Sequence, residues 1–140
     1  MSNTPLYRKS IEDARKAGEL KLWKDSFHEN VLCRIAIENE IRQHFDGMYL
    51  DSGCAERVLD VFGADRVKYV LSATLQEKDY DGRFSRSNKE WGKQTEIPYN
   101  IRNAEFAVQS HPAVLDGFVD QFRELCQRRQ MDHSFAPVMM

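Results

Sequence analysis

The sequence predicts a mainly α-helical fold: a single compact helical domain built around one long central helix at about residues 20–45. Apolar residues recur at helical spacing through most of the chain, and the long segment contains neither Gly nor Pro. A length of 140 residues is that of one domain. With 41% hydrophobic residues, 30% charged residues and a net charge of -2, the composition excludes a disordered chain, a membrane span and a uniformly basic nucleic-acid coat.

The first two helices are predicted from their ends and from one apolar arc. Ser10 starts a capping box with Asp13, and Gly18 suits a helix end, which predicts a short helix over 11–17. A helix over 20–45 would span about 39 Å and cross most of a domain of this size. Its apolar arc consists of Leu20, Trp23, Phe27, Val31, Ile35, Ile41 and Phe45.

Turn signals divide the middle of the chain. Asp46-Gly47 is expected to end the long helix, and Gly63 to end a helix that runs from about Cys54 to Phe62. Asp65 can cap the next helix. That helix has one apolar face, formed by Val67, Val70, Leu71, Thr74 and Leu75.

Residues 78–98 are expected to form an irregular loop region, because Gly and Pro interrupt any apolar period. Within it, the capping box S-N-K-E predicts a short helix from Ser87. The stretch 100–109 fits either a helix or a strand.

The last helix is predicted after Ser110 as its cap, with Pro112 in the first turn. Its apolar stripe consists of Val114, Leu115, Phe118, Val119, Phe122, Leu125 and Cys126. The apolar period is lost from Arg128. We therefore expect a single domain over residues 1–127 and a mobile C-terminal tail over 128–140.

The N-terminus and the cysteines predict a cytoplasmic location without membrane contact. No apolar run of signal-peptide length follows Arg8 and Lys9. Three widely spaced cysteines, Cys33, Cys54 and Cys126, form a poor disulfide framework and fit a reducing compartment.

Three polar residues follow one another along the long helix. Asn30, Arg34 and Glu38 lie at i, i+4 and i+8, within or beside its apolar face. We expect a buried polar cluster, because charge is tolerated inside a protein only when it is paired and hydrogen-bonded. A structural role in holding loops or helix ends is favoured over a ligand or partner site at the helix flank.

Metal and nucleophile signals are weak, so no metal, cofactor or catalytic residue is assigned. The four histidines, His28, His44, His111 and His133, show no zinc-ligand spacing. Cys33 lies inside a helix instead of at a helix N-terminus, where a thiolate would be stabilised. No glycine-rich phosphate loop is present.

Basic and aromatic side chains alternate after an Asp-Gly turn in residues 80–93. Arginine forks bind phosphate or carboxylate at two points, and aromatic faces stack on bases or guanidinium groups. We expect an outward-facing loop on a rigid helical frame; the alternative is a surface loop whose aromatic rings anchor it to the core while its charges are solvated. The candidate partner- or ligand-binding residues are Tyr80, Asp81, Arg83, Phe84, Arg86, Lys89, Trp91 and Lys93.

An ordered set of short motifs over about residues 5–125 resembles one bacterial domain family of unknown function. The motifs are P-L-Y-R-K-S (5–10), A-R-x-x-G-E-L (14–20), N-x-x-C-x-x-A-I-E (30–38), F-D-G-M (45–48), V-x-Y-V-L (67–71), D-G-R-F-S (81–85), N-x-x-W (88–91) and S-H-P (110–112). The resemblance implies a setting, that of accessory proteins of plasmids, conjugative elements and phages in anaerobic gut bacteria. It implies no reaction and no catalytic residue.

These observations together favour a non-enzymatic binding module encoded by a mobile genetic element. The leading hypothesis is an inhibitor of host defence, of the anti-CRISPR or anti-restriction type, that contacts a host protein or nucleoprotein complex through anion-binding or phosphate-mimicking contacts. One alternative is an accessory protein of element transfer that binds single-stranded nucleic acid. Another is a small nucleotide-directed enzyme with Glu38 and a histidine as acid and base. The partner, any ligand and the oligomeric state, including a homodimer, are left open by the sequence.

Overall fold

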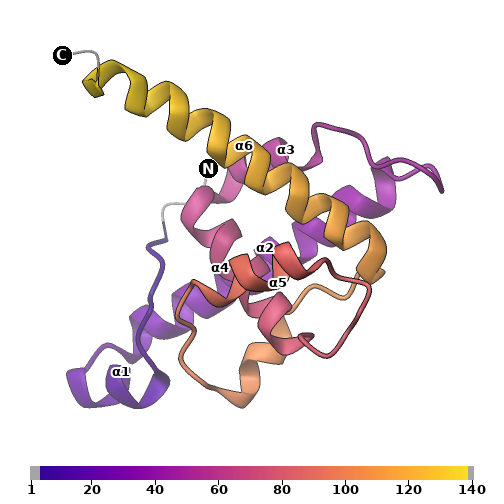
Figure 1. Cartoon of the computed structure of the whole chain (residues 1–140). Helices are drawn as coiled ribbons and strands as arrows, with labels where there is room; N and C mark the ends of the chain where they lie inside the picture. The colour runs from indigo at the N-terminus through magenta and orange to yellow at the C-terminus, as the bar shows by residue number, and fades with distance from the viewer. Residues whose placement is uncertain (1–3, 139–140) are drawn as a thin grey trace.

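A computed structural model describes residues 4–138 of the chain, with side chains described up to residue 129. Helices account for most of this part, and no strand occurs in it apart from one isolated bridge. The prediction of a mainly α fold is confirmed. The elements are α1 (Ile11–Ala17), α2 (Leu20–His44), α3 (Cys54–Phe62), α4 (Ala64–Glu77), α5 (Arg86–Lys93), the 3₁₀ helix η1 (Ile101–Phe106) and α6 (Pro112–Val138) (Figure 1).

The ends of α1 and α2 follow from local signals. The Ser10 hydroxyl accepts a hydrogen bond from the Asp13 amide at 3.0 Å, and Gly18 ends α1 in the left-handed region at φ 71°. The 25 residues of α2 extend about 37 Å and pass behind the other helices (Figure 1). The long central helix is confirmed to within one residue of its predicted end.

The turn after α2 is closed by a single side chain. The Asp46 carboxylate accepts hydrogen bonds from the Met48 and Tyr49 amides, both at 2.8 Å. Phe45 and Leu50 form the isolated antiparallel bridge across this turn. The prominent loop that results leaves Met48 and Tyr49 largely exposed.

The core forms where α4 packs among α2, α3, α5 and η1. Residues 66–75 of α4 are buried almost without interruption, so this helix has contacts on nearly every side. The predicted apolar faces of α4 and α6 both point inward. The largest fully buried side chains include Phe106, Phe118, Phe122, Ile37, Leu71, Leu75 and Leu115.

Three predicted helix caps are wrong in detail. The cap of α5 is Ser85, whose hydroxyl accepts from the Asn88 amide at 3.1 Å, and not Ser87. The last helix starts one residue after His111, whose Nδ1 accepts from the Ala113 amide at 3.2 Å, so Ser110 is not its cap. Asp65 lies in the first turn of α4 and does not precede it.

The last helix continues well beyond the predicted domain end. It runs to Val138, and its final turns project past the other helices (Figure 1). Arg129 pairs with Glu56 at 3.1 Å and with Asp60 at 3.5 Å, both on α3. Residues 128–138 are therefore helical, and their mobility stays a prediction; residues 1–3 of the predicted domain and 139–140 of the predicted tail lie outside the described part. Within residues 4–138, no helix is long and apolar enough to cross a membrane.

Candidate functional site

The aromatic rings of the predicted binding segment point into the protein. Phe84 is 3% exposed and belongs to the hydrophobic core. Trp91 is half-buried against Phe122, with ring centroids 6.0 Å apart, and the Arg123 guanidinium lies 5.8 Å from its centroid. The expectation that both rings face outward is wrong, because α4 and α6 supply an apolar surface that the rings cover.

A buried polar network fixes α5 against α6. The Asn88 side chain is fully buried, and its amide nitrogen donates to Asp116 Oδ1 at 2.8 Å and to Asp120 Oδ1 at 2.9 Å. Its oxygen accepts from Arg123 at 2.7 Å. Asp116 also accepts from the Ser85 amide at 2.9 Å, so the same carboxylate holds the start of α5. Every polar atom of the Asn88 side chain is thus used, which makes the network rigid.

Close backbone approach holds the other side of α5 to α4. A Cβ added at Gly92 would lie 2.9 Å from Leu75 Cβ, so only glycine fits here without a shift. The Gln76 amide donates to the carbonyls of Gly92 and Thr95, both at 2.8 Å. Residues 85–95 are therefore anchored from two sides.

The basic side chains of the segment remain at the surface. Arg83 pairs with Asp81 at 2.8 Å, Arg86 with Glu90 at 3.3 Å and Lys93 with Asp79 at 3.3 Å. The side chains of these three basic residues are 58%, 93% and 57% exposed. Lys89 forms no ion pair with the described residues, and Tyr80 is 83% exposed. We call Arg83, Arg86, Lys89 and Lys93 the basic face of α5.

Asp81 organises the turn before α5. Its carboxylate accepts from the Arg83 side chain at 2.8 and 3.0 Å and from the Arg83 amide at 2.9 Å. These hydrogen bonds, the side-chain ones above all, lower the pKa of Asp81 from 3.8 to about 2. Asp81 is therefore a turn-forming residue as well as a member of the predicted site.

The polar residues predicted on α2 separate into two groups. Arg34 and Glu38 pair with each other at 3.1 Å, and Glu38 also accepts from the Gln109 amide at 2.7 Å. Asn30 is buried and bonds to Arg66 on α4 instead. The geometry agrees with the structural interpretation, since Glu38 holds the loop before α6.

Sequence reasoning missed the buried arginine that organises this region. Arg66 is 2% exposed, and its guanidinium donates to Asn30 Oδ1, to the Ser26 carbonyl at 2.9 Å and to the Thr4 carbonyl at 2.9 Å. Desolvation by burial lowers the pKa of Arg66. Its position between buried residues of α4 offers one sequence signal, because an arginine one residue before an apolar face can lie on its edge.

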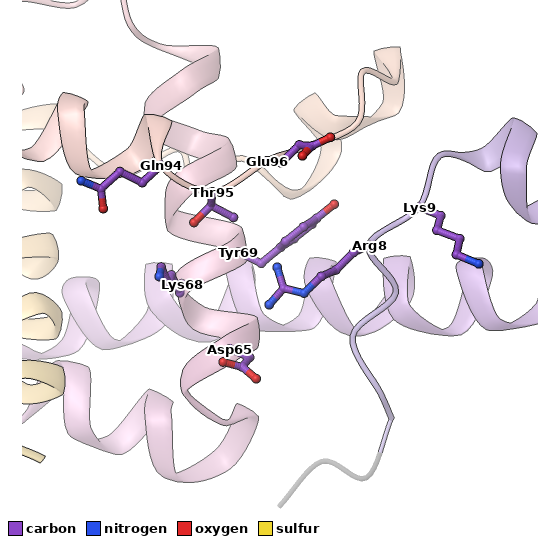
Figure 2. Close-up of a pocket in the computed structure, with 8 residues that line it drawn as sticks. All are labelled: Arg8, Lys9, Asp65, Lys68, Tyr69, Gln94, Thr95 and Glu96. Carbon is purple, nitrogen blue, oxygen red and sulfur yellow. The ribbon is translucent and has the colours of Figure 1, made fainter. Parts of the chain in front are cut away.

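Residues absent from the predicted site line a cavity at the N-terminal segment (Figure 2). The cavity has a volume of about 410 Å³. Arg8 and Lys9 reach it from the segment before α1, three residues from α4, and the rest from the chain just after α5 (Figure 2). The lining consists of Arg8, Lys9, Asp65, Lys68, Tyr69, Gln94, Thr95 and Glu96.

The cysteines are poor nucleophiles. Burial raises the pKa of Cys33 to about 12 and that of Cys54 to about 11, and it also raises the pKa of Cys126. All three are free thiols. Among the described residues, no group of three or more His, Cys, Asp or Glu side chains is arranged to hold a metal ion.

The fold and the site define a small all-helical domain that carries a rigidly docked basic helix and a separate cavity of mixed charge. Residues 6–127 match the family model described as "Protein of unknown function (DUF3849)". The chain belongs to this family, which confirms the expectation of a domain family of unknown function.

Two curated proteins, both named as the B-type subunit of DNA gyrase, show weak similarity to the chain. The one from Rickettsia conorii (strain ATCC VR-613 / Malish 7) is 26% identical over 145 residues, which cover 86% of this chain and 18% of that protein. The one from Rickettsia bellii (strain RML369-C) is 23% identical, covering 77% of this chain and 16% of that protein. The chain thus spans less than a fifth of the length of these relatives. No solved structure matches it.

Proposed function

We propose that this protein is a non-enzymatic binding module whose basic face of α5 contacts an acidic surface of a host protein or nucleoprotein complex. In the mobile-element setting that its motifs resemble, such a contact would inhibit a host defence system. The proposed mode is direct occupation of a surface by a preformed helix.

The observation that carries the proposal is the docking of α5. Asn88 and Gly92 fix the helix on opposite sides, while Arg86 and Lys93 stay exposed. Exposed ion pairs contribute only about 0–1 kcal/mol, so a partner carboxylate or phosphate can replace Glu90 or Asp79 at little cost. A rigid presenting helix also loses little conformational entropy on binding.

The aromatic residues have a different role in this proposal from the one expected from the sequence. Phe84 and Trp91 position the basic face instead of contacting the partner. Basic side chains that are rim contacts mainly affect association rate and its salt dependence. We therefore expect the charge of α5 to control how fast the complex forms.

Charge reversal on α5 tests the proposal. The double variant Arg86→Glu/Lys93→Glu should lose the partners that the wild-type protein captures from host lysate, while its thermal unfolding stays within a few degrees of wild type. The control Arg15→Glu/Lys24→Glu makes the same change in net charge on exposed positions of α1 and α2. Identical partner profiles for all three proteins would overturn the proposal.

A second candidate, an accessory protein that binds single-stranded nucleic acid, uses the same basic face. The weak similarity to two proteins named for DNA gyrase favours it. Four phosphate contacts predict that the logarithm of affinity falls with the logarithm of salt with a slope of about -3. A single-stranded oligonucleotide titration at several salt concentrations measures this slope, and no binding at low salt removes the candidate.

A further inference from the structure

The cavity beside the N-terminal segment holds cations that no carboxylate neutralises. Neither Arg8 nor Lys68 forms an ion pair with any residue of the described part. Most arginines elsewhere in that part do so, as Arg57 does with Glu40 and Asp51. Two unpaired cations from different elements thus line one cavity of about 410 Å³.

Tyr69 adds a hydrogen-bonding group between the walls of the cavity. Its side chain projects from α4, with the Arg8 guanidinium 5.9 Å from the ring centroid (Figure 2). The ring stacks on Phe106 with centroids 6.2 Å apart, and the residue is 6% exposed. Its hydroxyl bonds to no described residue, so it is available to a ligand.

The opposite wall is held rigidly and carries an acid. Thr95 is buried, and its carbonyl accepts from Gln76, which fixes residues 94–96 over α4. Glu96 is exposed at this wall without an ion pair in the described part. Asp65, the other acid of the cavity, lies in the first turn of α4, where the helix dipole favours negative charge.

We propose that this cavity binds a small organic oxyanion, a phosphate or carboxylate group on a molecule that also carries an amine. Arg8 and Lys68 bind the oxyanion, and the Tyr69 hydroxyl donates to it. Glu96 pairs with the amine. Charge-assisted hydrogen bonds of this kind are the stronger ones in proteins, and arginine offers a two-point fork to either oxyanion.

Lys9 does not add to the oxyanion site in the same way. Its ammonium lies 3.7 Å from Glu19, so its charge is partly matched within the protein. Arg8, Lys68 and Glu96 leave one net positive charge at the cavity. A singly or doubly charged anion with one amine therefore fits better than a polyanion such as nucleic acid.

Titrations with phosphoethanolamine and with β-alanine, followed by amide chemical shifts, test this site. We expect saturable shifts at Tyr69, Thr95 and Glu96 with one of the two probes, which also decides between phosphate and carboxylate. Inorganic phosphate and ethylamine, each carrying one half of the ligand, should bind more weakly. Absence of saturable shifts with both probes would overturn the proposal.

Matched variants identify the groups that bind. Lys68→Gln should weaken the bound probe by about tenfold, and Tyr69→Phe, which keeps the ring stack, by a smaller factor. Arg86→Gln removes the same charge on the basic face of α5 and should leave the affinity unchanged. Equal weakening by Lys68→Gln and Arg86→Gln would show non-specific attraction and refute the site. No residue of the cavity belongs to the basic face, so either proposal can fail alone.

Discussion

Arg66 is the residue whose loss should be felt most strongly, since its buried guanidinium joins α4, α2 and the N-terminal segment. Arg66→Met keeps much of the length and apolar volume but leaves the acceptors of Ser26, Asn30 and Thr4 without their donor. We expect a loss of about 3 kcal/mol in the free energy of unfolding, measured by urea denaturation. Arg86→Met, the same change at a 93% exposed position, should stay within about 0.5 kcal/mol of wild type. Equal effects of both changes would contradict the role given to Arg66.

Asp81 should titrate at unusually low pH. Its pKa of about 2 lies below its ordinary value of 3.8, so the stabilising contribution of its ionised form is fully present above about pH 4. That contribution is lost as the pH falls from about 4 to 2. Carboxyl chemical shifts in an acid titration check this value. Arg83→Gln should move the midpoint back toward 3.8, and an unchanged midpoint would show that the Arg83 side chain is not the cause.

At the scale of elements, two glycines in helices should respond to alanine in opposite directions. Gly92 in α5 faces Leu75, whose Cβ would be 2.9 Å from an added Cβ, whereas nothing lies within 4 Å of one added at Gly117 in α6. Gly92→Ala should therefore destabilise the protein by about 1–3 kcal/mol. Gly117→Ala should stabilise it by about 0.5–1 kcal/mol, because alanine favours the helix. Thermal unfolding of the two variants compares them directly, and stabilisation by both would mean that α4 and α5 are not in tight contact.

Helix existence could be predicted from the sequence because its signals are local. Ser10 and Gly18 define α1 by themselves, and the absence of Gly and Pro defines α2. The cap of α5 could not be predicted in this way. Ser85 and Ser87 both have capping sequences, and the amide of Ser85 is held by Asp116, which is 31 residues away.

The direction of side chains in the predicted site depended even more on distant parts of the chain. Phe84 and Trp91 alternate with basic residues as they would in a stacking site, yet the apolar surface of α4 and α6 turns them inward. The second alternative considered for residues 80–93, aromatic anchors with solvated charges, describes the geometry. The cavity could not be foreseen, because Arg8, Lys68 and Glu96 are far apart in sequence and come together only through the packing of the N-terminal segment.

At the scale of the molecule, α6 should differ in stability along its length. Residues 115–125 pack into the core, whereas the turns after Arg129 project beyond the other helices (Figure 1). We expect amide hydrogen exchange to be slow over 115–125 and much faster over 130–138. Arg129→Ala, which removes the ion pairs to Glu56 and Asp60, should extend fast exchange toward residue 126 without changing residues 115–122. Uniform protection to residue 138 would refute the predicted mobility of the tail.

The N-terminal segment contributes to two features at once, because Thr4 is bonded to Arg66 and Arg8 lines the cavity. An occupant that bridged Arg8 and Lys68 would clamp the first residues of the chain onto α4. Occupancy would then slow proteolytic cleavage before Ser10, and cleavage there would in turn empty the cavity.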